Sequence, residues 1–432
     1  MNKRFHSVYL DKTRCKGCTN CLKHCPTEAI RVRGGRAHII DERCVDCGEC
    51  IRICDYHAKV AMTDAFDEIF KFEHRIALPA PSLYGQFGRI ESIGVVLEAL
   101  KRVGFNEVFE VARGADVVTR AVQEKLRAKD RPYPLISSAC PAVTRIIQVR
   151  FPSLIPNIID VRAPMEVAAS MARSEYVQKH GVKPEKVGVF FITPCAAKMT
   201  AIRNPLGHAD SAVNGAISMV EMYGHLLPHI SSIRASDVKT EATPFGVGWA
   251  NSGGEARAAI PKNSIVVDGI ANVIRVLEEV ENGKLKDIDY FEGAACLGGC
   301  VGGPLTYENK YLAHNTVAML MDKLPARHPD DTVDPEMLKR YPLDFDKPIE
   351  PNNSMKLHES IASAIERMEQ MNAIIERLPG YDCGSCGSPT CRSFAEDIVR
   401  GYCSETDCIF LLRDRLKVMA QQMVDISQTM RE

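Results

Sequence analysis

Short apolar runs, each ending in a cysteine, alternate with amphipathic stretches through the middle of the chain. Three of these runs predict buried strands, in residues 134–141 with Cys140, 187–195 with Cys195 and 290–296 with Cys296. Helical stretches such as 90–103 and 164–180 lie between them. Strands that alternate with helices predict that residues 70–350 form an α/β domain with a largely parallel sheet. Ligands bind outside the carboxyl ends of such strands, which is where the three cysteines fall.

Beyond residue 354 the apolar positions follow helical spacings. Residues 355–378 predict a helix with one apolar side, formed by Ile361, Ile365, Met368, Ile375 and Leu378. Residues 409–432 predict a second helix, whose apolar side chains recur at alternating spacings of three and four at Ile409, Leu412, Leu416, Met419, Met423, Ile426 and Met430. This a/d seam indicates a parallel homodimeric coiled coil, because a helix packed on its own domain would show a wider stripe. A tail docked on the same chain is the alternative.

Composition and charge narrow the class of protein. The 432 residues carry a formal net charge of −1, which gives no sign of a nucleic-acid partner or an acidic membrane surface. No apolar run approaches the roughly 20 residues of a membrane span. The N-terminus lacks the apolar core of a signal peptide, so we expect a cytoplasmic protein, in which disulfides are rare. Seventeen cysteines in that compartment indicate metal or redox chemistry.

The cysteines of residues 1–62 form a duplicated motif. The run C-x2-C-x2-C-x3-C occurs twice, as Cys15, Cys18, Cys21 and Cys25 and as Cys44, Cys47, Cys50 and Cys54. It is the bacterial ferredoxin pattern, in which the fourth cysteine of each run serves the other cluster. We therefore predict two 4Fe–4S clusters, one on Cys15, Cys18, Cys21 and Cys54 and the other on Cys44, Cys47, Cys50 and Cys25. Zinc is the alternative, but zinc knuckles use paired cysteines rather than triplets.

A glycine-rich stretch over residues 291–303 carries two more cysteines, Cys296 and Cys300. Small residues allow the backbone to approach a bulky inorganic group, and thiolate is the soft ligand that iron–sulfur clusters select. With Cys140 and Cys195 they make a further set of four. The alternative is a glycine-rich turn with two buried free cysteines.

The ferredoxin segment and the central region together resemble the iron-iron (FeFe) hydrogenases. That family has three signatures, Thr-Ser-Cys-Cys-Pro, Met-Pro-Cys-x-x-Lys and Glu-x-Met-x-Cys-x-x-x-Cys. The corresponding stretches of this chain run from Ser137 through Ala139 and Cys140 to Pro141, from Thr193 through Cys195 to Lys198, and from Glu292 through Cys296 to Cys300. The resemblance implies a central catalytic domain of the hydrogenase type that interconverts H2 with protons and electrons.

The resemblance also implies the roles of individual residues. Cys140, Cys195, Cys296 and Cys300 would hold a 4Fe–4S cluster, and Cys300 would bridge it to a two-iron site with CO, cyanide and an amine-containing dithiolate, completing the H-cluster. Lys198 would donate a hydrogen bond to one cyanide, and the backbone of Ala80, Pro81 and Ser82 would contact the other. A solvated lysine at a helix start is the alternative for Lys198. Implied partners are H2, protons, a redox partner such as ferredoxin or another subunit, and the enzymes that mature the cofactor.

The chain departs from the family around the two-iron site. Ala139 stands where the family has the cysteine that passes protons, and alanine cannot carry a proton. Other departures are Thr193 and Ala294 for two shielding methionines, Val143 for a tryptophan, and a stretch after Asp116 in which only Glu124 is acidic. This combination, in which the cluster ligands are kept and the proton route is lost, resembles the sensory branch of the family. In that branch H2 is sensed or turned over slowly.

Two other functions stay open. One is a non-catalytic iron–sulfur electron-transfer or cluster-assembly protein without the two-iron site, against which Lys198 and residues 80–82 argue. The other is a redox subunit of a larger complex, in which H2 chemistry is secondary.

Residues 355–408 contain a last cysteine motif. Its spacing, C-G-x-C-G-x3-C with a fourth cysteine 17 residues further on, resembles a small 4Fe–4S domain of electron-transfer proteins, with Cys383, Cys386, Cys391 and Cys408 as ligands. Zinc is again the alternative, since C-x2-C pairs also suit zinc. Cys403 is expected to be a packed free thiol.

Overall fold

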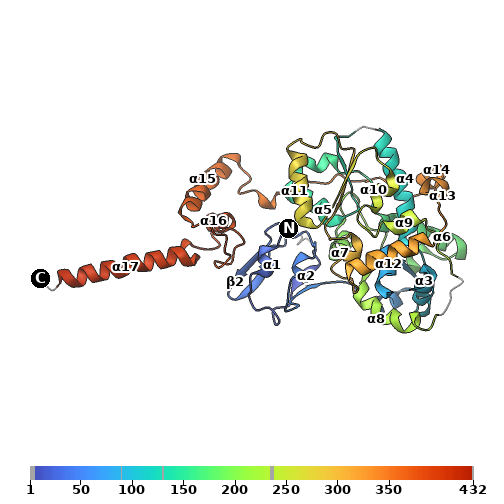
Figure 1. The fold of residues 1–432 in the computed structure, drawn as a ribbon, viewed down its shortest axis with the longest axis horizontal. Coiled ribbons are helices and arrows are strands. Elements are labelled where there is room, and N and C mark those ends of the chain that lie inside the picture. The colour runs from blue at the N-terminus through green and yellow to red at the C-terminus, as the bar shows by residue number, and fades with distance from the viewer. Residues whose placement is uncertain (1–4, 89, 129–130, 234–237, 431–432) are drawn as a thin grey trace. The chain divides into compact units, whose positions relative to one another are not determined.

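The chain forms two compact units in the computed structural model, which describes residues 5–88, 90–128, 131–233 and 238–430 (Figure 1). Unit 1 comprises residues up to 8, 45–48 and 61–351. Unit 2 comprises residues 9–44, 49–60 and 352–432. The predicted boundaries of four domains stay predictions.

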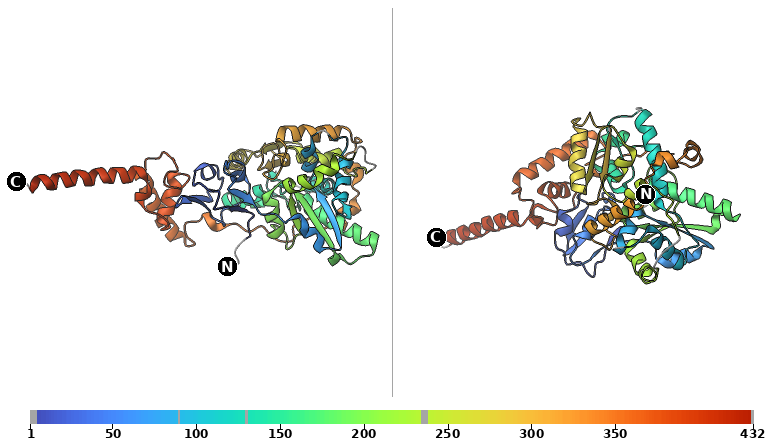
Figure 2. Two further views of the ribbon diagram at one scale, coloured as in Figure 1. Left: turned by 90° about the horizontal axis from the view of Figure 1, so that it is seen from below. Right: turned by 45° about the vertical axis from the view of Figure 1, so that its right-hand side comes forward.

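Two parallel sheets form the centre of unit 1. The first has the strand order β6-β5-β8-β9 and the second β10-β11-β7. Their bounds are β5 His74–Pro79, β6 Glu107–Val108, β7 Leu135–Ile136, β8 Val187–Thr193, β9 Gly215–Ser218, β10 Ser264–Asp268 and β11 Tyr290–Ala294. Figure 2 shows β5 and β8 side by side, with His74 paired to Val187. The described strand pairs of both sheets are parallel, which confirms the predicted α/β architecture.

Helices surround these sheets. They are α3 Ile93–Arg102, α4 Val111–Ala128, α5 Pro141–Arg150, α6 Pro164–His180, α7 Ala196–Arg203, α8 Met219–Ile230, α9 Pro244–Gly248, α10 Gly254–Ala259, α11 Ile270–Glu281, α12 Lys310–Asp322, α13 Pro329–Thr332 and α14 Pro335–Arg340. Helix α6 has the predicted bounds, because proline suits its first turn and Gly181 ends it in the left-handed conformation, at φ 66°. The helix expected over residues 90–103 is shorter and starts after Ser92.

Two local features bring the strand ends to one place. Strand β8 is buried at all seven positions, as expected for an apolar run inside a parallel sheet. Helix α4 crosses α6 at Gly114, where a Cβ atom would lie 2.5 Å from the carbonyl oxygen of Pro164. Only glycine permits that approach. The crossing holds the start of each helix near the carboxyl ends of the strands.

Unit 2 contains two small sheets and a group of helices. Its strands are most of β1 (Val8–Leu10), paired with most of β4 (Lys59–Ala61), and β2 Ile30–Arg33, paired antiparallel with β3 Arg36–Ile39. Its helices are α1 Asn20–Lys23, α2 Glu49–Arg52, α15 Ile361–Arg377, α16 Cys391–Val399 and α17 Ile409–Thr429. In α15 the buried residues are Met371 and Ile374, while Ile361 and Ile365 are exposed, so the predicted apolar side is wrong at its N-terminal end.

Helix α17 is the red helix at the C-terminal end of the chain in Figure 1. Every residue from Leu412 to Gln428 is exposed, including the side chains of the predicted seam. The homodimeric coiled coil stays a prediction. Among the residues that the structure describes, no helix has both the length and the apolar character needed to cross a membrane.

Candidate iron–sulfur and active site

A cavity of about 130 Å³ lies in unit 1 where strands β5, β7, β8 and β11 end. It is lined by all the residues predicted to hold or contact the H-cluster, namely Ala80, Pro81, Ser82, Ala139, Cys140, Cys195, Lys198, Cys296 and Cys300. Four thiols that converge on one apolar cavity are a donor set that fits an iron–sulfur cluster. The roles of these residues stay predictions, but the fold brings them together.

The turns after the strands hold the cysteines in place. Cys195 precedes α7, and its backbone N–H donates to Oγ1 of Thr193 at 3.1 Å. Cys140 stands immediately before α5, whose first residue is Pro141. Gly299 has a φ of 88°, and a Cβ atom there would lie 2.5 Å from the backbone nitrogen of Ser252. Thr193, one of the departures from the family, therefore supports the cysteine turn.

Two of the cavity's thiols, those of Cys195 and Cys300, resist ionisation as long as they hold no metal. Burial raises the pKa of Cys195 to about 11, and the neighbouring Cys140 adds to the effect. Burial raises the pKa of Cys300 to about 12, although its side chain keeps accessible surface where it lines the cavity. The Lys198 cation opposes both shifts. Cluster binding requires thiolates, so loading this site releases protons.

Lys198 reaches across the cavity from α7. Its Nζ donates to the carbonyl oxygen of Ala139 at 2.8 Å. This contact ties the second cysteine turn to the first, and it leaves the ammonium with further donors for an anionic ligand. Ala80, Pro81 and Ser82 follow β5, and Ser82 is fully buried.

A buried polar network that the sequence reasoning missed lines the same cavity. Oγ of Ser137 donates to Oε2 of Glu255 at 2.6 Å, and the Tyr290 hydroxyl donates to Oε1 at 2.5 Å. Glu292 accepts backbone N–H groups from Gly253 at 2.8 Å and Ala256 at 2.7 Å. The side chains of Ser137, Glu255 and Glu292 all line the cavity. Glu292 was visible in the third motif, but no motif surrounds Glu255.

Burial disfavours the charged form of both carboxyl groups. It raises the pKa of Glu255, and together with the nearby Glu255 charge it raises the pKa of Glu292 to about 8. A carboxyl group that keeps its proton near neutral pH can both donate and accept one there. The cavity therefore holds groups able to move protons although position 139 is alanine.

The stretch from Asp116 to Glu124, where the family resemblance led us to expect acidic residues, contributes no described residue to the lining of this cavity. Glu124 is exposed, and neither it nor Asp116 is among the described residues that line the cavity. The carboxylate of Asp116 accepts from the backbone N–H and the hydroxyl of Thr243 at 2.9 and 2.6 Å. Burial raises the pKa of Asp116 to about 6. Its contacts tie α4 to the start of α9.

The N-terminal cysteines surround a small apolar core in unit 2. Cys15 and Cys21 are buried in it, and Cys25, Cys50 and Cys54 pack against it. The sulfur atoms of Cys25 and Cys54 each accept the N–H of the residue four positions later, Ala29 at 3.2 Å and Ala58 at 3.3 Å. Such donors tune iron–sulfur clusters, and their repetition matches the duplicated motif. Cys18 and Cys44 are half-buried in unit 2, whereas Cys47 belongs to unit 1 and lines its cavity.

The C-terminal cysteines also meet. Cys383, Cys386, Cys391 and Cys408 line one small cavity of about 20 Å³. Cys403 is not among its described lining residues, and its sulfur lies 3.9 Å from the Phe394 carbonyl oxygen. Burial raises the pKa of Cys403 to about 11, so it stays a thiol. The set of four is the one predicted.

Comparison with protein families identifies the chain. The family model described as the iron only hydrogenase large subunit, C-terminal domain matches residues 73–263 and 255–304, more than half of the chain. A 4Fe–4S dicluster domain matches residues 7–55, and a putative Fe–S cluster domain matches residues 378–410. The chain therefore belongs to the iron-only, or FeFe, hydrogenase family.

Individual relatives are distant. The chain is 27% identical over 214 residues to the periplasmic Fe hydrogenase large subunit of Nitratidesulfovibrio vulgaris, covering 45% of this chain and 51% of the relative. It is 21% identical over 377 residues to iron hydrogenase 1 of Clostridium pasteurianum, covering 70% and 65%. A solved FeFe hydrogenase structure from Chlamydomonas reinhardtii matches with 17% identity and a TM-score of 0.49, over 65% of this chain and 92% of that one. The chain thus spans 51% and 65% of the lengths of these two curated relatives.

Proposed function

We propose that the chain is a slow FeFe hydrogenase of sensory or regulatory type, which interconverts H2 with protons and electrons. One observation carries the proposal. The cavity combines four cysteines and Lys198 with an alanine at position 139, where the family passes protons through a cysteine. The site keeps the groups that would hold the cofactor, while the thiol that would serve its turnover is missing.

The chain's residues would hold the H-cluster in stated roles. Cys140, Cys195, Cys296 and Cys300 would bind its 4Fe–4S part, and Cys300 would bridge to the two-iron part. Lys198 would donate to one cyanide, and residues 80–82 would enclose the other. When bound, the H-cluster supplies the iron that splits and forms H2 and the amine that exchanges the proton.

Ser137 and Glu255 offer the proton route that replaces a thiol at position 139. The Ser137 hydroxyl accepts the N–H of Ala139 at 3.2 Å and donates to Glu255, so it links the backbone of residue 139 to that carboxyl group. Glu255 then continues the chain of hydrogen bonds to Tyr290. General acid–base catalysis by a well-placed group contributes about 10²–10⁴-fold, so we expect turnover slower by that order than with cysteine at 139.

The remaining parts of the chain would carry electrons and a signal. The ferredoxin-like clusters would exchange electrons with a redox partner protein in the cytoplasm. A homodimer through α17 would bring two sites together, and Cys408 would link the C-terminal cluster to that helix, because it is the residue that caps α17.

Isotope exchange tests this function directly. Protein matured anaerobically with the two-iron cofactor should form HD from deuterium gas in ordinary water, and a Cys300→Ala variant prepared alongside should not. Loaded protein that forms HD no faster than the Cys300→Ala variant would contradict the proposal.

A cluster-assembly or electron-transfer protein without the two-iron site is the second candidate. Ala139, Thr193 and Ala294 favour it, because each departs from the family at the two-iron site while the 4Fe–4S ligands are kept. This candidate predicts about sixteen irons per chain, four for each of four clusters, and no exchange.

A further inference from the structure

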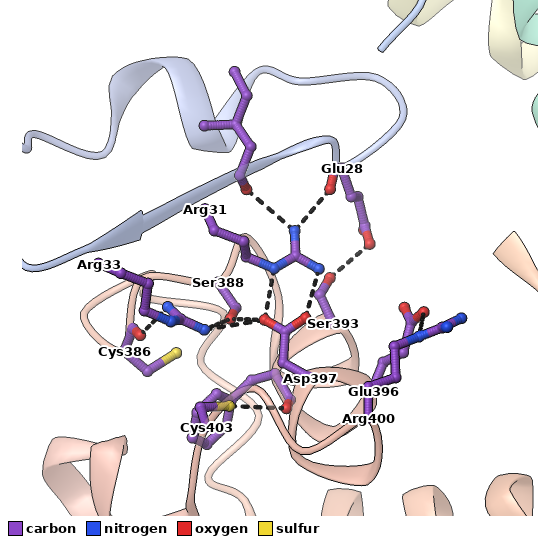
Figure 3. Close-up of polar contacts among 12 residues, drawn as sticks. Glu28, Arg31, Arg33, Cys386, Ser388, Ser393, Glu396, Asp397, Arg400 and Cys403 are labelled. Atoms are coloured by element: carbon purple, nitrogen blue, oxygen red, sulfur yellow. Dashed lines mark hydrogen bonds and ion pairs between the residues drawn. The ribbon is translucent and has the colours of Figure 1, made fainter. Parts of the chain in front are cut away.

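A buried cluster of ion pairs lies inside unit 2, between residues that are more than 350 positions apart in the sequence (Figure 3). Asp397 of α16 is 3% exposed. Its carboxylate accepts from Nε and Nη2 of Arg31 at 2.6 and 3.0 Å, and from Nη2 of Arg33 at 3.0 Å. The Ser388 hydroxyl donates to the same carboxylate at 2.6 Å. Both arginines stand on β2, in the ferredoxin-like segment.

Contacts from β2 reach a predicted cluster ligand. Nη1 of Arg33 donates to the carbonyl oxygen of Cys386 at 2.6 Å. The backbone N–H of Val32 donates to the carbonyl oxygen of Gly387 at 2.9 Å. A Cβ atom at position 387 would lie 1.8 Å from the carbonyl oxygen of Val32, so only glycine allows this approach. Strand β2 therefore lies directly against the turn that presents Cys386.

A second contact joins the two cysteine loops. A Cβ atom at Gly384, next to Cys383, would lie 3.3 Å from Cδ2 of Leu22, the residue that follows Cys21. Nζ of Lys23 donates to the carbonyl oxygen of Pro389 at 3.3 Å. The loop of one predicted cluster is thus in contact with the loop of the other, and an electron crossing between them has a short path.

The charges of the ion-pair cluster do not cancel. Two guanidinium cations face the single carboxylate of Asp397. The excess positive charge lies beside Cys386. An iron–sulfur cluster on four thiolates is anionic and gains a negative charge on reduction, so this charge favours the reduced form.

We propose that unit 2 is one electron-transfer module, in which the C-terminal cluster exchanges electrons directly with the cluster of Cys15, Cys18, Cys21 and Cys54, and Arg33 raises the reduction potential of the C-terminal cluster. The transfer moves one electron from one reduced cluster to the other oxidised cluster, and no bond is made or broken. The proposal rests on the proposed iron–sulfur function of these segments and not on the H2 chemistry.

Arg33 is a positioning residue, so a reduction potential is the appropriate readout. The full chain, reconstituted with iron and sulfide, is titrated with a chemical reductant and followed by electron paramagnetic resonance. Arg33→Gln should shift one cluster to a more negative potential and leave the others in place. Arg36→Gln is the matched control, because Arg36 is an exposed arginine of the neighbouring strand whose side chain donates to the carbonyl oxygen of the adjacent Gly35. Arg33→Lys should restore part of the shift.

The sign of a second variant separates charge from structural damage. Asp397→Asn removes the negative charge, so it should move the same cluster to a more positive potential, opposite to Arg33→Gln. Shifts of the same sign in both variants, or no shift with Arg33→Gln, would overturn the role of Arg33.

Direct exchange has its own readout. Neighbouring clusters should show spin–spin broadening in the fully reduced protein. Cys391→Ser should remove the part that involves the C-terminal cluster and leave the broadening between the two clusters of the ferredoxin-like segment. Broadening that is unchanged in Cys391→Ser, or zinc instead of iron in the C-terminal site, would overturn the module. These experiments use a chemical reductant in place of H2. If they overturn the electron-transfer module, the isotope-exchange test of the hydrogenase proposal is therefore unaffected.

Discussion

Replacing Glu255 by glutamine should slow H2 turnover sharply while the fold is kept. Glu255 is 5% exposed and is the acceptor for two hydroxyl groups, those of Ser137 and Tyr290. A glutamine carbonyl can accept from one hydroxyl while its amide group donates to the oxygen of the other, so both stay paired. The variant therefore removes the titratable proton but leaves no buried hydroxyl without a partner.

The size of the effect follows from that single loss. A positioned general acid or base contributes about 10²–10⁴-fold, which corresponds to roughly 2.7–5.4 kcal/mol of barrier at 1.36 kcal/mol per tenfold. Glu255 lies two hydrogen bonds from the position that the family fills with a thiol, because Ser137 bonds both Glu255 and the N–H of Ala139. We therefore expect Glu255→Gln to lower the rate by at least 10²-fold.

The assay is dye-linked H2 oxidation, with cofactor loading measured on the same samples by infrared absorption. Glu336→Gln is the matched control, since Glu336 is an exposed glutamate of α14 that pairs with Lys339. An equally loaded Glu255→Gln protein with the rate of the parent would refute the proton route.

Three further predictions follow from the same geometry. Ala139→Cys should raise turnover about 10²–10⁴-fold in the dye assay, and no gain at equal loading would remove the reason given for slowness. In the folded metal-free protein the pKa of Glu292 is raised to about 8 from its unfolded value of 4.5. The contribution of Glu292 to the free energy of unfolding is therefore complete below pH 4.5 and is lost as the pH rises through 8. The melting temperature of Glu292→Gln relative to the parent should accordingly rise between pH 5 and 9, whereas a constant difference would contradict the burial argument. Leu416→Asp should convert a dimer to monomers in sedimentation equilibrium, because burying each leucine in the seam stabilises the dimer by about 1.5–3 kcal/mol. Gln421→Asp, on the outer face of the helix, should leave the dimer intact. A parent chain that is already monomeric would contradict the predicted coiled coil.

The cysteine positions could be predicted because local rules determine them. A buried apolar run such as residues 187–193 has to form a central strand, and parallel strands collect their carboxyl ends at one place. Cys195 and Cys296 therefore meet in the fold, although about 100 residues separate them in the sequence. The duplicated and C-terminal motifs were recognisable for a related reason, since most of their cysteines are separated by only two to four residues in the sequence.

Interactions made only by tertiary packing could not be predicted in this way. Glu255 lies in a short helix without a motif, and it becomes a cavity residue only because α10 packs beside β11. Asp397 and Arg31 look like ordinary surface charges in sequence, and only the packing within unit 2 buries them. Ile361 and Ile365 fitted the helical period of α15, but the neighbouring core covers Met371 and Ile374 instead.

The central claim is that the cavity of unit 1 holds a hydrogenase cofactor. The most direct measurement is the infrared spectrum of protein matured anaerobically with the two-iron cofactor, recorded first under nitrogen and then under H2. The account predicts bands of bound CO and cyanide that shift when H2 is admitted. A full complement of iron–sulfur clusters without such bands, or bands that do not respond to H2, would contradict it.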